Sequence, residues 1–158
     1  VVSFHSLSKR SNLPGLRSGF AASGEKNIKQ MKQLRAYSGA PIPEPLQHVS
    51  ASVWDDENHV IQNREIYKKK YKFADKIFDD FDGYLSPEAG FFLWLDVDNG
   101  EKTALELWQT RGVRVLPGRY LAKDLNGQSP GDRFIRVAMV SELEETKDGL
   151  KKIREFLN

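Results

Sequence analysis

The stretch from Glu57 to Phe81 constrains the fold of this chain more than any other part of the sequence. Its apolar residues recur mostly three or four positions apart, and they are Val60, Tyr67, Tyr71, Ala74, Phe78 and Phe81. This spacing predicts one helix with an apolar stripe, preceded by candidate N-caps at Asp55 and Asp56 and stopped near Gly83. At about 1.5 Å per residue it would run roughly 37 Å, longer than a typical globular helix. A helix of this length often bridges two domains.

The composition excludes several function classes. The chain has 158 residues, 24 basic and 22 acidic side chains, and no cysteine. The near balance of charge argues against a dedicated nucleic-acid binder, and the lack of cysteine excludes disulfides, thiolate nucleophiles and Cys-ligated metals. No apolar run approaches the roughly 18–20 residues that span a bilayer, and the first residues do not resemble a signal peptide. The three histidines show no ligand-like spacing, so no metal is predicted. We expect a soluble, cytoplasmic α/β protein with no nucleic-acid or membrane partner.

The rest of the chain alternates short apolar runs with helical patterns. Strands are predicted at Val1–Phe4, Gly19–Ala22, Phe91–Val97, Gly112–Leu116 and Phe134–Val140. Helices are predicted at Glu25–Tyr37, Leu46–Trp54, Lys102–Thr110 and after Ser141, where Ser141 and Glu144 would form a capping box. The segment Ser38–Pro41 is predicted to end the first of these helices. The lysines of the long helix, which include Lys68, Lys69 and Lys70, are interpreted as a solvated face.

The segment from Ser6 to Gly19 carries most of the chemistry, and its first part, Ser6–Leu16, is predicted to be a loop. Hydroxyls and an arginine in one loop suit a phosphate, because a hydroxyl donates one hydrogen bond and a guanidinium donates two in parallel. Lys9 could add a point charge on the same anion or act as a nucleophilic amine. The alternative from residue types alone is a solvated basic loop, since charged loops are common.

Two short catalytic motifs can be tested against this segment and fail. Ser6-x-x-Lys9 matches the S-x-x-K of serine β-lactamases and penicillin-binding proteins, which also need S-D-N and K-T-G downstream. The sequence has no S-D-N, and Lys102-Thr103 is followed by Ala104 instead of glycine. A phosphate-binding Walker loop requires G-K-[ST], which does not occur.

Arg136 is the second candidate site residue. It lies in the apolar run Phe134–Val140, and by strand alternation it shares a face with Phe134 and Ala138. A buried or half-buried arginine favours a carboxylate bound bidentately. The alternative is an arginine on an edge strand that points to water.

The pattern Ser6-x-Ser8-Lys9-x-x-Asn12-x-x-Gly15-x-Arg17-x-Gly19 resembles the cofactor-lysine signature of class I/II pyridoxal-phosphate-dependent aminotransferases. The resemblance implies that Lys9 bonds to pyridoxal 5'-phosphate and then moves a proton, that Ser6 and Arg17 bind the cofactor phosphate, and that Arg136 binds the substrate α-carboxylate. It also implies the C-terminal part of an aspartate-aminotransferase-like fold. Residues 1–55 would be the end of the large cofactor domain, and residues 56–158 a small α+β domain that includes the long helix.

A finer resemblance concerns the substrate. Together with the Ser6–Phe20 segment, Leu116–Leu121 and Asn126–Gly131 resemble N-succinyldiaminopimelate aminotransferases of bacterial lysine biosynthesis, although that family commonly has a small residue at the position of Arg119. These enzymes exchange an amino group between glutamate and a succinylated keto-acid. The alternatives are an aspartate or aromatic aminotransferase, and a non-catalytic α/β module that binds a phosphorylated ligand.

The start of the sequence predicts that this chain is part of a longer protein. The chain begins with Val1 in a strand-like run, so we expect it to be a piece cut within a fold. Complete members of the family are more than twice this length, and they use an aspartate on the pyridine nitrogen that would precede Lys9. The resemblance therefore implies that this chain alone is inactive and that the full-length enzyme is a homodimer.

Overall fold

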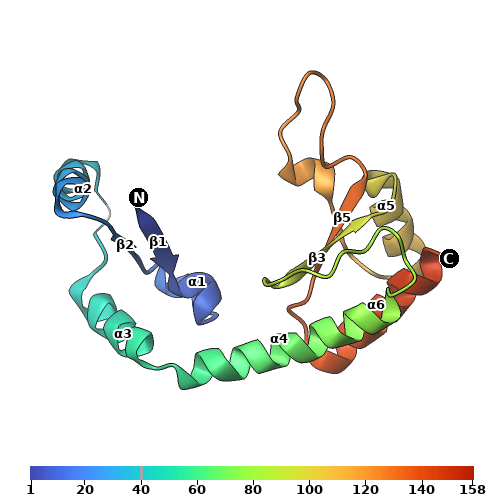
Figure 1. Ribbon diagram of the computed structural model, residues 1–158, viewed down its shortest axis with the longest axis horizontal. Coiled ribbons are helices and arrows are strands. Elements are labelled where there is room, and N and C mark those ends of the chain that lie inside the picture. Colours follow the sequence, from blue (N-terminus) through green and yellow to red (C-terminus); the bar gives the residue numbers. More distant parts are fainter. Residues whose placement is uncertain (40) are drawn as a thin grey trace. The chain divides into compact units, whose positions relative to one another are not determined.

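The computed structural model describes residues 1–39 and 41–158, which divide into two compact units (Figure 1). The first unit is Val1–Arg64 and the second is Glu65–Asn158. The boundary between these units falls inside the long helix α4 (Asn58–Ile77). Each unit contains its own helices and a small antiparallel sheet, so the chain has the mixed α/β class that the sequence predicts.

The first unit is built on a two-stranded antiparallel hairpin. Its strands are β1 (Ser3–Ser6) and β2 (Gly19–Ala22), joined through α1 (Leu7–Arg10) and the short 3-10 helix η1 (Pro14–Leu16). The remaining elements are α2 (Glu25–Ser38), α3 (Glu44–Asp55) and the first part of α4. The hairpin packs on α3 through aromatic rings, because the ring of Phe20 lies 5.0 Å from that of His5 and 4.9 Å from that of Trp54.

The structure corrects two predictions in this unit. The first strand lies at Ser3–Ser6, two residues later than predicted, where all four residues pair with β2. The predicted loop Ser6–Leu16 contains two helical turns, because Ser6 caps the first of them and Pro14 opens the second. The helices α2 and α3 are confirmed. The predicted stop after α2 includes Ala40, which lies outside the described residues.

The long helix α4 is confirmed but ends at Ile77 instead of Phe81. It begins at Asn58, one residue later than predicted, and Asp56 supports its start, since the Oδ1 of Asp56 accepts the backbone N–H of Asn58 at 2.9 Å. Beyond Ile77 the chain closes into tighter turns, in which the N–H of Phe81 donates to the carbonyl of Phe78 at 3.1 Å. Phe81 still packs against the core of the second unit, so the apolar pattern continues beyond the last residue of the helix.

The second unit packs helices on a three-stranded antiparallel sheet of order β3-β5-β4. Its strands are β3 (Phe92–Asp96), β4 (Leu116–Pro117) and β5 (Phe134–Ala138). Its helices are α5 (Gly100–Arg111), the 3-10 helix η2 (Gly118–Leu121) and α6 (Leu143–Phe156), which runs beside the second half of α4 (Figure 1). The fully buried core combines side chains from all of these layers: Phe78, Leu93, Leu95, Leu107, Ile135, Leu150 and Ile153.

Two further predictions are corrected in this unit. The predicted strand Gly112–Leu116 shrinks to Leu116–Pro117, because Gly112 caps α5 in the left-handed conformation, where its N–H bonds helix carbonyls. The predicted capping box of Ser141 and Glu144 does not form. The N-cap of α6 is Glu142, which makes no side-chain cap bond.

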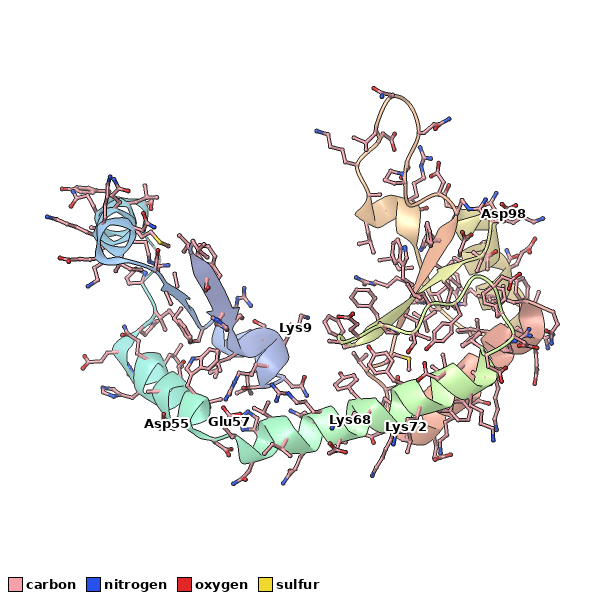
Figure 2. All side chains as sticks on the ribbon, viewed as in Figure 1. Lys9, Asp55, Glu57, Lys68, Lys72 and Asp98 are labelled. Carbon is pink, nitrogen blue, oxygen red and sulfur yellow. The ribbon has the colours of Figure 1, made fainter. Side chains whose placement is uncertain are left out.

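Lys70 overturns the prediction that the lysine-rich side of α4 is fully solvated. Lys68 and Lys72, labelled in Figure 2, are exposed, but Lys70 is 4% exposed. Its ammonium donates to the carbonyls of Met139 at 2.8 Å and Ser141 at 2.5 Å. Burial lowers the pKa of the Lys70 amine. This lysine therefore joins α4 to the segment between β5 and α6.

Replacing Lys70 with methionine should destabilise the protein. The substitution keeps the apolar stem but leaves the buried carbonyl of Met139 without its donor, which costs about 2 kcal/mol of unfolding free energy. Urea denaturation of the full-length protein measures the loss. The exposed neighbour Lys69 supplies the control, because Lys69→Met should leave the unfolding free energy almost unchanged. Equal values for the two variants would contradict the assigned role of Lys70.

Candidate active site

The connection between β1 and β2 is an ordered turn of the first unit. Leu7, its first helical residue, is completely buried. The backbone N–H of Leu7 donates to the carbonyl of Ser18 at 3.1 Å, which ties the start of the connection to its end. The carbonyl of Leu7 accepts the N–H groups of Ser11 and Leu13 at 3.1 and 3.2 Å. This network makes the connection an ordered one, although its basic side chains Lys9 and Arg17 are exposed.

Ser6 stands at the N-cap of α1. Its hydroxyl oxygen accepts the backbone N–H of Ser8 at 3.1 Å and lies 3.0 Å from the Ser8 hydroxyl and 3.4 Å from the Ser18 carbonyl. In β1 it pairs with Gly19. Ser6 is exposed, so the hairpin and the cap hold a hydroxyl in a fixed position at the surface of the unit.

Arg17 lies at the other end of the same connection. Its backbone is in the left-handed region at φ 49°, which non-glycine residues seldom adopt, and its Nη1 donates to the carbonyl of Pro14 at 2.7 Å. Gly19 is required nearby, since a Cβ there would lie 2.4 Å from the carbonyl oxygen of His5. Because Arg17 precedes Ser18, whose carbonyl approaches the Ser6 hydroxyl, Arg17 and Ser6 belong to the same end of the hairpin.

Lys9 lies on α1, between these two groups in the sequence (Figure 2). Successive helix residues are rotated by about 100°, so Lys9 is about 200° from the buried Leu7 around the helix. Lys9 is correspondingly exposed. One ordered connection thus carries a primary amine, a hydroxyl and a guanidinium, the groups that suit a phosphate and a nucleophile.

Arg136 belongs to the second unit and lies in the middle strand of its sheet. It pairs with Trp94 of β3 and Leu116 of β4, so the alternative of an edge-strand arginine is wrong. Its side chain is half-buried, and the guanidinium lies 5.6 Å from the centre of the Phe92 ring. Within residues 1–39 and 41–158, no carboxylate forms an ion pair with it. Its donors can therefore take a carboxylate from a ligand.

Sequence reasoning missed a group of residues that anchors α1. Arg10 donates to the carbonyls of Val53 and Trp54 at 3.2 and 3.3 Å and forms an ion pair with Glu57. The available signal was the spacing of Leu7 and Arg10, which places both on one helix face. That signal is visible only once the segment is known to be helical.

Residues 1–39 and 41–158 contain neither a cluster of metal ligands nor a membrane-spanning helix. In this part of the chain, no three histidine, aspartate or glutamate side chains gather as they would around a metal ion. None of its helices has the length and apolar character needed to cross a bilayer.

Comparison with known proteins adds the family. The family model of aminotransferase class I and II matches residues 1–153. The chain belongs to this family. Its members are transaminases that depend on pyridoxal phosphate, as the Ser6–Gly19 pattern predicts.

The similar curated proteins are transaminases of several kinds. The 4-dedimethylamino-4-oxo-anhydrotetracycline transaminase OxyQ of Streptomyces rimosus is 26% identical over 142 residues, which cover 89% of this chain and 38% of OxyQ. The LL-diaminopimelate aminotransferase of Dehalococcoides mccartyi is 26% identical over 160 residues, which cover 98% of this chain and 40% of that enzyme. The chain thus spans about two fifths of the length of these relatives.

Solved structures confirm the fold over the whole chain. An aminotransferase from Neisseria meningitidis matches with a TM-score of 0.93 and 37% identity, over 99% of this chain and 40% of its own. The aminotransferase AspB from Helicobacter pylori matches with a TM-score of 0.88 and 35% identity, over the same shares. The fold is therefore that of the C-terminal part of an aspartate-aminotransferase-like enzyme, as predicted.

The residues of the first unit fit the cofactor of this family. Pyridoxal phosphate carries a phosphate and an aldehyde, and the hairpin offers a hydroxyl and a guanidinium for the first and an exposed amine for the second. A hollow of about 510 Å³ beside Arg17 is lined by His5, Arg17, Phe20 and Lys32, among others. Its cationic lining agrees with an anionic ligand.

Proposed function

We propose that the full-length protein is a pyridoxal-phosphate-dependent aminotransferase in which Lys9 carries the cofactor. Ser6 and Arg17 hold its phosphate, and Arg136 binds the α-carboxylate of the substrate. The observation that carries the proposal is the exposed Lys9 amine on a helical turn whose connection begins at Ser6 and ends at Arg17. In this proposal residues 1–55 end the large cofactor domain and residues 56–158 form the small domain.

Each of these residues has a distinct chemical task. When bound, the cofactor supplies an electron sink for the charge that develops at the substrate Cα. Lys9 would bond the cofactor aldehyde and serve as general base for the proton at the substrate Cα. Arg136 would orient the substrate through two parallel hydrogen bonds to its carboxylate. Arg17 and Ser6 would hold the cofactor phosphate.

We further propose that the substrates are glutamate and N-succinyl-2-amino-6-ketopimelate, which places the enzyme in lysine biosynthesis. The support is the resemblance in Leu116–Leu121 and Asn126–Gly131, which form one packed unit. A Cβ on Gly131 would lie 2.4 Å from the carbonyl oxygen of Gly118, so the two segments touch through their backbones. Arg119 of the first segment forms a 2.7 Å ion pair with Asp132, the residue that follows the second. Several similar enzymes are named as LL-diaminopimelate aminotransferases.

Amino-donor profiling tests this proposal. The full-length protein, loaded with pyridoxal phosphate, is given 2-oxoglutarate and one donor at a time. We expect kcat/KM for N-succinyl-LL-diaminopimelate to exceed that for aspartate or phenylalanine by at least about tenfold. A preference for either of those donors would replace the substrate assignment and keep the aminotransferase. Phosphate-ligand binding without turnover of any donor would favour a non-catalytic module. Light scattering of the same sample tests the proposed homodimer.

A further inference from the structure

We propose that Arg10 is a positioning residue for Lys9, and this inference rests on the proposed function. α1 has four residues, Leu7–Arg10. A single helical turn is not stable by itself, because nucleation fixes several residues for one hydrogen bond. The direction in which the Lys9 amine points therefore depends on what holds α1 from outside, and the contacts of Arg10 supply that support.

One face of α1 is buried and the other is exposed. Leu7 and Arg10 are three positions apart and share one face, which is turned into the unit: Leu7 is fully buried, and the Arg10 side chain is 18% exposed. Lys9 lies on the open side of the turn. Anchoring the inner face fixes the rotation of the turn about its axis, and that rotation sets the direction of Lys9.

Arg10 forms hydrogen bonds with the C-terminal end of α3. Its guanidinium donates to the carbonyls of Val53 and Trp54, which are in the last turn of the helix and have no partner within it. The same guanidinium lies 4.8 Å from the centre of the Trp54 ring and pairs with Glu57. The flat, forked shape of arginine is needed to reach two carbonyls and a carboxylate at once.

A second tether lies beside the first. Arg10 donates to the hydroxyl of Ser11 at 3.3 Å, and that hydroxyl lies 2.9 Å from Nε2 of His59. Nδ1 of His59 lies 2.8 Å from the carboxylate of Asp56, and this hydrogen bond is the main cause of the lowered pKa of Asp56. The residue after α1 is therefore fixed to the start of α4 as well.

The phosphate ligands are held by other means. Besides capping α1, Ser6 is held by its pairing with Gly19 in the hairpin and by the approach of its hydroxyl to the Ser18 carbonyl, and Arg17 by its left-handed turn and its bond to Pro14. Loss of Arg10 should therefore disturb Lys9 much more than phosphate binding. This difference separates a positioning role for Lys9 from a general structural role.

Two ligands distinguish an effect on Lys9 from an effect on phosphate binding in the full-length protein. Pyridoxal 5'-phosphate needs Lys9 to form its covalent bond, whereas pyridoxine 5'-phosphate has no aldehyde and reports phosphate binding alone. For Arg10→Met we expect covalent capture, followed by the visible absorbance of the bound cofactor, to slow by about 10- to 100-fold. The dissociation constant of pyridoxine 5'-phosphate should stay within about twofold of wild type.

Three other variants make the test decisive. Arg10→Lys keeps the charge without the fork and should fall between wild type and Arg10→Met. Glu57→Gln removes only an exposed ion-pair partner and should slow capture by about two- to fivefold, which keeps the test open if Arg10→Met fails to fold. Arg64→Met is the control, because Arg64 is exposed and bonded to no described residue. It should match wild type.

The outcomes separate this inference from the function on which it rests. Wild-type capture rates in Arg10→Met and Glu57→Gln, or equal losses of capture and pyridoxine phosphate binding in Arg10→Met, would overturn the positioning role. Undiminished capture in Lys9→Ala would instead overturn the proposed function. Slow capture with intact pyridoxine phosphate binding supports both.

Discussion

Replacing Lys9 with alanine should abolish both the covalent attachment of pyridoxal phosphate and transamination. The variant keeps Ser6 and Arg17, so we expect it still to bind the cofactor phosphate. It loses the group that bonds the aldehyde and takes the Cα proton. We expect kcat to fall by about 10⁴-fold or more, since general-base catalysis alone contributes up to about that factor. Steady-state turnover of the full-length protein, together with the visible absorbance of bound cofactor, measures both losses.

A second exposed lysine of the same unit serves as the control for Lys9→Ala. Lys26 also belongs to the first unit and is exposed, but it lies on α2. Lys26→Ala should keep wild-type turnover and absorbance. Normal turnover in Lys9→Ala would show that another residue does the work assigned to Lys9.

Replacing Arg136 with lysine should weaken recognition of the substrate carboxylate. Arg136 is half-buried in a central strand and has no acidic partner among the described residues, which leaves its donors available for the proposed ligand carboxylate. Lysine keeps the charge but cannot make two parallel hydrogen bonds. Losing one hydrogen bond to a charged group costs about 1.5–3 kcal/mol, so we expect kcat/KM to fall by about 10- to 150-fold.

The comparison must separate carboxylate binding from loss of folding. Arg133 lies next to the same strand, is exposed, and pairs with Asp96 and Asp98 on the surface. Arg133→Lys should therefore keep kcat/KM close to wild type. A simple primary amine without a carboxylate should react equally slowly with wild type and Arg136→Lys. An unchanged kcat/KM for amino acids in Arg136→Lys would contradict the assignment.

The sequence predicts the helices of this chain well, because their apolar spacing survives packing. The stripe from Val60 to Phe78 is buried or half-buried as expected. The errors lie where a single contact decides the outcome. α4 stops at Ile77 although the apolar pattern continues to Phe81, and the strand expected from Gly112 starts only at Leu116, because a glycine cap takes its place. Periodicity carries no information about such caps.

The same difference between local patterns and long-range contacts applies to single side chains. Ser6, Lys9 and Arg17 are predicted from residue type and from the spacing of a pattern that resembles the family signature, and both are local properties of the sequence. Arg10 and Lys70 were not found, since their roles depend on carbonyl groups 43 and 69 positions away in the sequence. Lysines and arginines usually lie in water, and only the folded backbone shows which of them is enclosed.

The most direct measurement of the central claim is the site of cofactor attachment. The full-length protein is loaded with pyridoxal phosphate, reduced with borohydride so that the bond becomes permanent, digested, and mapped by mass spectrometry. We expect the added cofactor mass on the peptide that contains Lys9, and its loss when inorganic phosphate competes at the Ser6 and Arg17 site. Stoichiometric attachment to any other lysine, or no attachment at all, would contradict the account.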